Sequence, residues 1–101
     1  MSKQIEQPVV DAVILDDADH VATALRALSP SETVRVGGPG GLSAIIAAES
    51  VPLCHKIAVK AVKSGDPVFK YGYFIGYATQ AIEPGEHVHI HHLESRASKQ
   101  K

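Results

Sequence analysis

Four of the six histidines in the sequence lie within the segment 87–92, which reads His-Val-His-Ile-His-His. Alternate side chains of a strand share one face, so His87, His89 and His91 are expected on one face, about 7 Å from neighbour to neighbour. Two such imidazoles nearly converge on one metal ion, whereas three in a straight strand converge poorly. A metal here would need a further ligand from a partner, and neutral imidazole suits Fe, Zn, Ni or Cu. The alternative interpretation is an exposed polar face that is rich in histidine.

His55 and Lys56 form a second candidate group, just before an expected strand. Lysine offers a point charge to a carboxylate, and histidine offers a hydrogen bond or a proton. His55 alone fits a ligand role and a structural hydrogen bond equally well. Cys54 precedes this pair, but neighbouring residues of a strand point apart, so the order Cys-His does not indicate a thiol nucleophile.

Tyr71 belongs to a third group, because all five aromatic residues lie between positions 69 and 77. Its hydroxyl group is a candidate contact for a ligand. The alternative interpretation is that these aromatic side chains pack in a small core or at an interface, where aromatic rings with polar tips are favoured.

Short β-like runs separated by turn residues must position these groups, which indicates a small, mainly β unit. Val21–Leu28 has the apolar spacing of a short helix, and Asp19 is a candidate N-cap for it. Residues 42–49 are ambiguous between helix and strand. A type II turn is expected at Glu83–Glu86, with glycine at its third position. The expected strands are Val9–Leu15, Thr33–Val36, Ile57–Val62, Val68–Lys70, Ile75–Thr79 and His87–His91.

The segment Gly37–Gly41 is the strongest chain-breaking signal in the sequence. It lacks both the Gly-Lys-Ser/Thr ending and the GxGxxG spacing of phosphate-binding loops. We therefore expect a flexible connector there.

The composition limits the possible classes of protein. The 101 residues and 10.7 kDa correspond to one domain, and a net charge of −1 disfavours nucleic acid and membrane surfaces as partners. Residues 1–50 carry seven acidic and three basic residues, whereas residues 51–101 carry four acidic and seven basic ones. The basic, histidine-rich half suits an anionic ligand. One cysteine, no secretory signal and no long apolar run favour the cytoplasm.

Several motifs of the second half occur in an order that resembles the N-terminal SAF-type domain of the altronate/galactarate dehydratase family. The resemblance covers about residues 9–93 and implies a β-clip fold, mainly β with one or two short helices. The polar ends of the chain are expected to be loose tails, at 1–7 and 94–101, which leaves the domain at 8–93. Cys54 and His92 depart from the family pattern, which usually has Gly and Asn there. The matching segments are Asp19, Val21–Leu25, Pro52, His55–Val59, Gly65–Val68, Lys70–Gly72, Ile75–Gly76, Ala78–Thr79, Ile82, Gly85 and His87–His91.

The resemblance implies the small subunit of a two-part lyase that eliminates water from a sugar acid of the altronate or galactarate type, giving a 2-keto acid. Its partners would be a large catalytic subunit and a small anionic hydroxy acid. Family dehydratases depend on iron, so Fe²⁺ is the implied cofactor, held largely or partly by the partner. Carried over by position, the catalytic candidates are His55, Lys56 and Tyr71. The metal-ligand candidates are His87, His89 and His91.

Other functions remain open at this stage. The family also includes sulfolactate sulfo-lyase, in which sulfite leaves instead of water. A non-catalytic SAF module that binds sugar acids or metal is a further possibility, as is an assembly or regulatory protein that shares only the fold.

Overall fold

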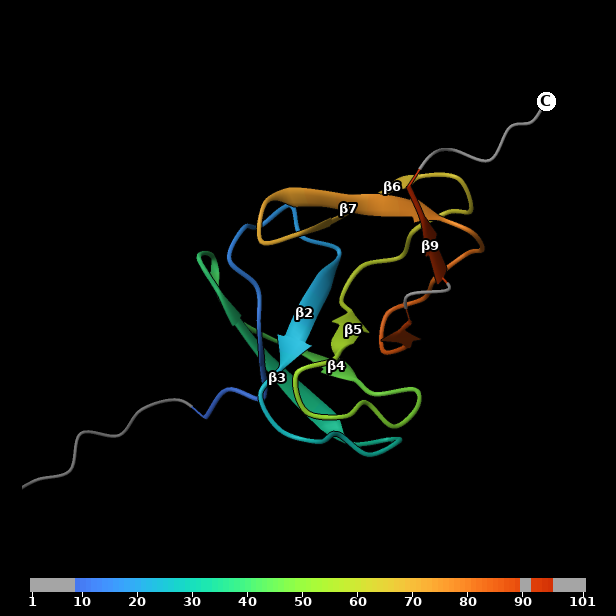
Figure 1. Cartoon of the computed structure of the whole chain (residues 1–101). Coiled ribbons are helices and arrows are strands. Elements are labelled where there is room, and N and C mark those ends of the chain that lie inside the picture. The colour runs from blue at the N-terminus through green and yellow to red at the C-terminus, as the bar shows by residue number, and fades with distance from the viewer. Residues whose placement is uncertain (1–8, 90–91, 96–101) are drawn as a thin grey trace, which may run out of the picture.

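The computed structural model describes residues 9–89 and 92–95 and forms two β-sheets (Figure 1). The larger sheet has the strand order β4-β3-β1-β2-β5-β8, and the smaller one has the order β6-β7-β9. The strands are β1 (Ala12–Val13), β2 (Val21–Ala24), β3 (Thr33–Gly38), β4 (Gly41–Ile46), β5 (Lys56–Ala58), β6 (Pro67–Lys70), β7 (Tyr73–Ala78), β8 (His87–Val88) and β9 (Leu93–Glu94).

The expectation of a mainly β domain is confirmed, but the expectation of short helices is wrong. No α-helix is present among the described residues. Val21–Leu28 begins as the central strand β2, which pairs with β1 and β5. Three of its four residues are buried, because packed neighbours cover both faces of this strand. A strand buried on both faces lacks the two-residue alternation that identifies strands, so its apolar pattern imitated a helix.

The glycine-rich segment forms a β-hairpin rather than a flexible connector. Gly38 of β3 pairs with Gly41 of β4, and Pro39 and Gly40 form the turn between them. The ambiguous residues 42–49 supply most of β4. Along β3, buried Val34 and Val36 alternate with exposed residues, as expected for a strand with one covered face.

Each of the six expected strands overlaps an observed strand, although the bounds differ: β3, β6 and β7 are longer than predicted, and β1, β5 and β8 are shorter. Val9–Leu15 contains the two-residue β1, and the expected final strand contains β8. His91 lies outside the described residues, so its place on a shared face stays a prediction. The expected tail at 1–7 and residues 96–101 of the expected C-terminal tail also lie outside the described residues, whereas Glu94 belongs to β9 and not to a loose tail.

Two apolar cores lie on opposite faces of the β2–β5 pair. Ala22 and Ile57 belong to the first core, and Val21 and Ala58 belong to the second core, beneath the small sheet. The first core consists of Ala12, Ala22, Ala24, Leu28, Val34, Val36, Ala47, Val51 and Ile57. The second consists of Val21, Ala58, Val62, Val68, Ala78, Ile82 and Val88. Alternate side chains of β2 and β5 therefore point into the two different cores.

The predicted turn at Glu83–Glu86 has glycine where positive φ is required. Gly85 has a φ of 93°, and a Cβ atom there would lie 2.2 Å from the carbonyl oxygen of Ile46. Gly65 has a similar φ of 89°, but nothing lies within 4 Å of its Cβ position. The two glycines therefore share a backbone conformation and differ in their surroundings.

This difference predicts unequal costs of alanine substitution. We expect Gly65→Ala to lower the free energy of unfolding by about 1 kcal/mol, the cost of the left-handed conformation. Gly85→Ala should lower it by about 3–4 kcal/mol, because the backbone at Ile46 must also move. Urea unfolding of both variants measures these costs, and equal losses would contradict the packing argument.

Candidate active site

His55 and His87 meet although 32 residues separate them in the sequence. His55 Nδ1 lies 2.9 Å from His87 Nε2, a distance at which one imidazole donates a hydrogen bond and the other accepts it. The pairing of β5 with β8 brings them together, because Ile57 lies opposite His87 in the register. His55 is just before β5 and is exposed, whereas His87 is only 6% exposed.

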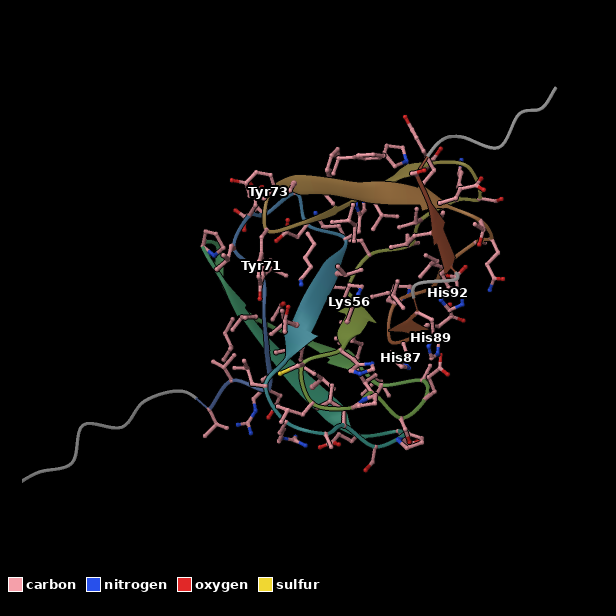
Figure 2. All side chains as sticks on the ribbon, viewed as in Figure 1. Lys56, Tyr71, Tyr73, His87, His89 and His92 are labelled. Atoms are coloured by element: carbon pink, nitrogen blue, oxygen red, sulfur yellow. The ribbon has the colours of Figure 1, made fainter. Side chains whose placement is uncertain are left out.

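His89 and His92 extend this pair into a cluster of four imidazoles, of which Figure 2 labels His87, His89 and His92. The ring centroids of His87 and His89 are 3.8 Å apart, and those of His89 and His92 are 5.4 Å apart. The backbone N–H of His89 donates to His92 Nδ1 at 2.9 Å. We call His55, His87, His89 and His92 the histidine cluster.

Burial keeps the His87 imidazole in its neutral form. Desolvation lowers the pKa of His87, and the neighbouring His89 and His55 lower it further. Glu49 opposes these effects, and its carboxylate accepts the backbone N–H of His87 at 3.0 Å. A neutral imidazole retains one nitrogen lone pair, which can accept a proton or bind a metal.

The described residues do not complete a metal site. Between residues 9 and 89 and over 92–95, no three His, Cys, Asp or Glu side chains are arranged to hold a metal ion. His87 and His89 lie close together, but the predicted third ligand, His91, is not described. The predicted metal role of His87, His89 and His91 therefore stays a prediction, and it requires ligands from outside the described part of the chain.

Lys56 and Tyr71 belong to a second group, on the face of β2 and β5 that is turned toward the small sheet. Lys56 lies opposite Thr23 in the register, so their side chains share this face. The Tyr71 hydroxyl donates to Thr23 Oγ1 at 2.7 Å, and Lys70 Nζ lies 4.8 Å from the centroid of the Tyr71 ring. We call Thr23, Lys56, Lys70 and Tyr71 the lysine–tyrosine group.

The predicted catalytic residues are thus divided between two groups that are adjacent along β5. His55 joins the histidine cluster, whereas Lys56 and Tyr71 belong to the lysine–tyrosine group. In the view of Figure 2, Lys56 lies between Tyr71 on one side and the labelled histidines on the other. The sequence reasoning did not identify Thr23 or Glu49 as site residues, because long-range contacts bring them to the site: Thr23 through its strand pairing with Lys56, and Glu49 through its hydrogen bond from the His87 N–H.

Asp19 fixes the turn that carries Tyr71. Its buried carboxylate accepts the backbone N–H of Gly72 at 2.8 Å, of Leu15 at 3.1 Å and of Asp16 at 3.2 Å. Tyr71 has a φ of 56°, a left-handed conformation that is uncommon for a residue with a large side chain. The predicted chemistry of Asp19, acceptance of free N–H groups, is confirmed, but these groups belong to two turns and not to a helix.

These hydrogen bonds also determine the charge of Asp19. Burial alone would raise the pKa of this carboxyl group, but the backbone N–H groups of Gly72, Leu15, Tyr71 and Asp16 outweigh burial and lower it. Asp19 is therefore ionised at neutral pH. Both of its carboxylate oxygens accept hydrogen bonds from backbone N–H groups near the lysine–tyrosine group.

The fold and the two polar groups define a small two-sheet β domain, consistent with the β-clip architecture. The family model of the altronate/galactarate dehydratase SAF domain matches residues 10–96. The chain therefore belongs to this family, as the resemblance of its motifs predicted.

Two kinds of curated relatives share this domain. Altronate dehydratase from Bacillus subtilis (strain 168) is 35% identical over 80 residues, which are 79% of this chain and 15% of that protein. The (2R)-sulfolactate sulfo-lyase subunit alpha from Paracoccus pantotrophus is 40% identical over 52 residues, which are 52% of this chain and 78% of that protein. The match to the subunit alpha from Chromohalobacter salexigens covers 51% of that protein. The chain thus spans a small part of altronate dehydratase and a larger part of the sulfo-lyase subunits. In the described part of the chain, no helix has the length and apolar character needed to cross a membrane.

The role of Asp19 predicts a pH-dependent loss of stability. We expect Asp19→Asn to lower the free energy of unfolding by about 2–3 kcal/mol at pH 7, because charge-assisted hydrogen bonds to backbone N–H groups are lost. The folded-state pKa is lowered, so this stabilisation is complete above the unfolded pKa of about 3.9 and is lost as the pH falls through the folded value.

Urea unfolding of the parent chain and the variant between pH 7 and pH 3 measures this difference. Asp66→Asn is the matched control, because Asp66 is exposed. A difference between the parent and Asp19→Asn that does not change with pH would contradict the assigned role.

Proposed function

We propose that this chain is the SAF component of a two-part lyase that eliminates water from a sugar acid of the altronate or galactarate type. The observation that carries the proposal is the 2.9 Å contact between His55 and His87. The motif that contains His55 and the motif that contains His87 meet at this contact. Both motifs belong to a domain of the dehydratase family. The lysine–tyrosine group lies on the opposite face of β5.

The proposed reaction is a β-elimination. A base removes the proton on the carbon next to the carboxylate, the hydroxyl group on the β carbon leaves as water after taking up a proton, and the resulting enol becomes a 2-keto acid. Exposed His55 is suited to exchange protons with the substrate. Buried His87 is the positioning residue, because its hydrogen bond orients the His55 ring.

A large catalytic subunit is the proposed partner. The chain matches 15% of the length of altronate dehydratase, and the sulfo-lyase relatives bear the name subunit alpha. Fe²⁺ remains the proposed cofactor, with ligands supplied largely or partly by the partner. The cytoplasm is the proposed compartment, since the single cysteine, Cys54, is free and exposed.

Sulfolactate sulfo-lyase activity is the second candidate function. The match to the Paracoccus pantotrophus subunit alpha has the higher identity and covers 78% of that protein. In this reaction the leaving group on the β carbon is sulfite rather than water, and the proton abstraction is the same.

The test is an assay of this chain co-expressed with a large chain that corresponds to the remainder of altronate dehydratase. Altronate, galactarate and sulfolactate are supplied separately, and 2-keto acid and sulfite are measured. Production of 2-keto acid without sulfite, from altronate or galactarate, supports the dehydratase. Release of sulfite from sulfolactate supports the second candidate. A stable pair that converts none of the three acids would contradict both and favour a non-catalytic module.

Variants of the histidine pair test its role in the active pair. We expect His55→Gln and His87→Gln each to lower kcat about 100-fold or more, the usual contribution of a general acid or base. Lys63→Ala is the control, because Lys63 is exposed on a turn away from both groups. Full activity of both histidine variants would show that the pair takes no part in the reaction.

A further inference from the structure

The lysine–tyrosine group places two ammonium groups over one face of the central strands. Lys56 is on β5 and half-buried, and Lys70 is the last residue of β6. Two hydrogen bonds join His20, the residue before β2, to Phe69 of β6. The backbone N–H of His20 donates to the Phe69 carbonyl at 2.9 Å, and the backbone N–H of Phe69 donates to His20 Nδ1 at 3.0 Å. The packing of the small sheet on the larger one therefore sets the position of Lys70 relative to the face that carries Lys56.

Neither ammonium group is neutralised within the described residues. The ion pairs of this part of the chain join Arg26 and Arg35 to carboxylates, and none involves Lys56 or Lys70. Asp19 is the nearby buried acid, but its oxygens are occupied by backbone N–H groups. Two positive charges beside an apolar core are costly without an anion, so the group is suited to bind one.

The hydroxyl groups add a directional donor. Tyr71 donates its hydroxyl proton to Thr23 Oγ1, and in this arrangement the proton of the Thr23 hydroxyl remains available to an acceptor. Lys56 lies opposite Thr23 in the register, so this donor and the ammonium group share a face. Asp19 holds the turn and keeps Tyr71 in its left-handed conformation, a form of backbone strain that clusters at binding sites.

We propose that Lys56, Lys70 and Thr23 bind the carboxylate of a small organic acid, with Tyr71 as the residue that positions Thr23. A carboxylate presents two oxygens, which suits two separate ammonium groups and one hydroxyl donor. The choice of a hydroxy acid as the ligand rests on the proposed function. The site itself rests on the geometry of the lysine–tyrosine group, which is separate from the histidine cluster.

The test is titration of the 101-residue chain with galactarate at constant ionic strength, followed by backbone amide NMR. We expect saturable binding with a Kd of about 1–10 mM, with the largest shifts at Thr23, Lys56, Lys70 and Tyr71. Galactitol, which lacks the carboxylates, should cause no shifts. Sulfate distinguishes a carboxylate site from a general anion site and should bind at least about 10-fold more weakly.

Variants then separate specific binding from general attraction between charges. Lys56→Met and Lys70→Met should each weaken galactarate binding about 10-fold or more, whereas Lys63→Met should leave it unchanged. Tyr71→Phe should weaken binding about 3-fold or more, while Tyr73→Phe, at an exposed tyrosine of the same turn, should not. Circular dichroism confirms that each variant is folded.

Several outcomes would overturn the proposal. These are no shifts in the parent chain, shifts centred on the histidine cluster, equal weakening by Lys63→Met, or sulfate binding as tight as galactarate. The parent titration needs no variant, so the proposal stays testable if a variant fails to fold. The titration also needs no partner chain. If the isolated chain does not bind galactarate while the co-expressed pair is active, the proposed carboxylate site is wrong and the proposed function still stands.

Discussion

The hydrogen bonds of one buried carboxylate, that of Asp19, connect the parts of this domain that matter for function. Asp19 accepts N–H groups from the turn that follows β1 and from the turn between β6 and β7, so it joins the two sheets at one end of the molecule. Tyr71 depends on this contact for its backbone conformation, and Thr23 depends on Tyr71 for its hydrogen bond. One buried charge thus organises a chain of contacts that ends at the lysine–tyrosine group.

The central strands β2 and β5 divide the candidate chemistry between two surfaces. Their alternating side chains supply both apolar cores, and the same alternation separates His55 and Lys56, which are neighbours in the sequence. The histidine cluster is suited to move protons, whereas the lysine–tyrosine group is suited to bind an anion. An elimination from a hydroxy acid needs both tasks, which is why the placement of the two groups on the two sides of β5 is consistent with the proposed lyase.

Much of the fold could be predicted from the sequence, because turn residues and alternating apolar residues report local structure. The hairpin strand at Thr33–Val36 and the glycine at position 85 are examples. The residues of β2 have the pattern of a helix instead, since burial on both faces removes the alternation typical of a strand. The contact between His55 and His87 could not be predicted, because it depends on the long-range register of β5 and β8. For the same reason, Asp19 was recognised as an acceptor of N–H groups but assigned to the wrong element.

The central claim is that the histidine cluster and the lysine–tyrosine group, which lie on opposite faces of β5, both take part in the reaction of the proposed two-part lyase. Hydrogen exchange of the assembled pair, measured with and without the substrate it converts, tests this most directly. The account predicts that substrate slows exchange of backbone amides in the segments of both groups, residues 55–57 with 87–89 and residues 70–73. Slower exchange at neither segment, with protection confined to the partner chain, would contradict it.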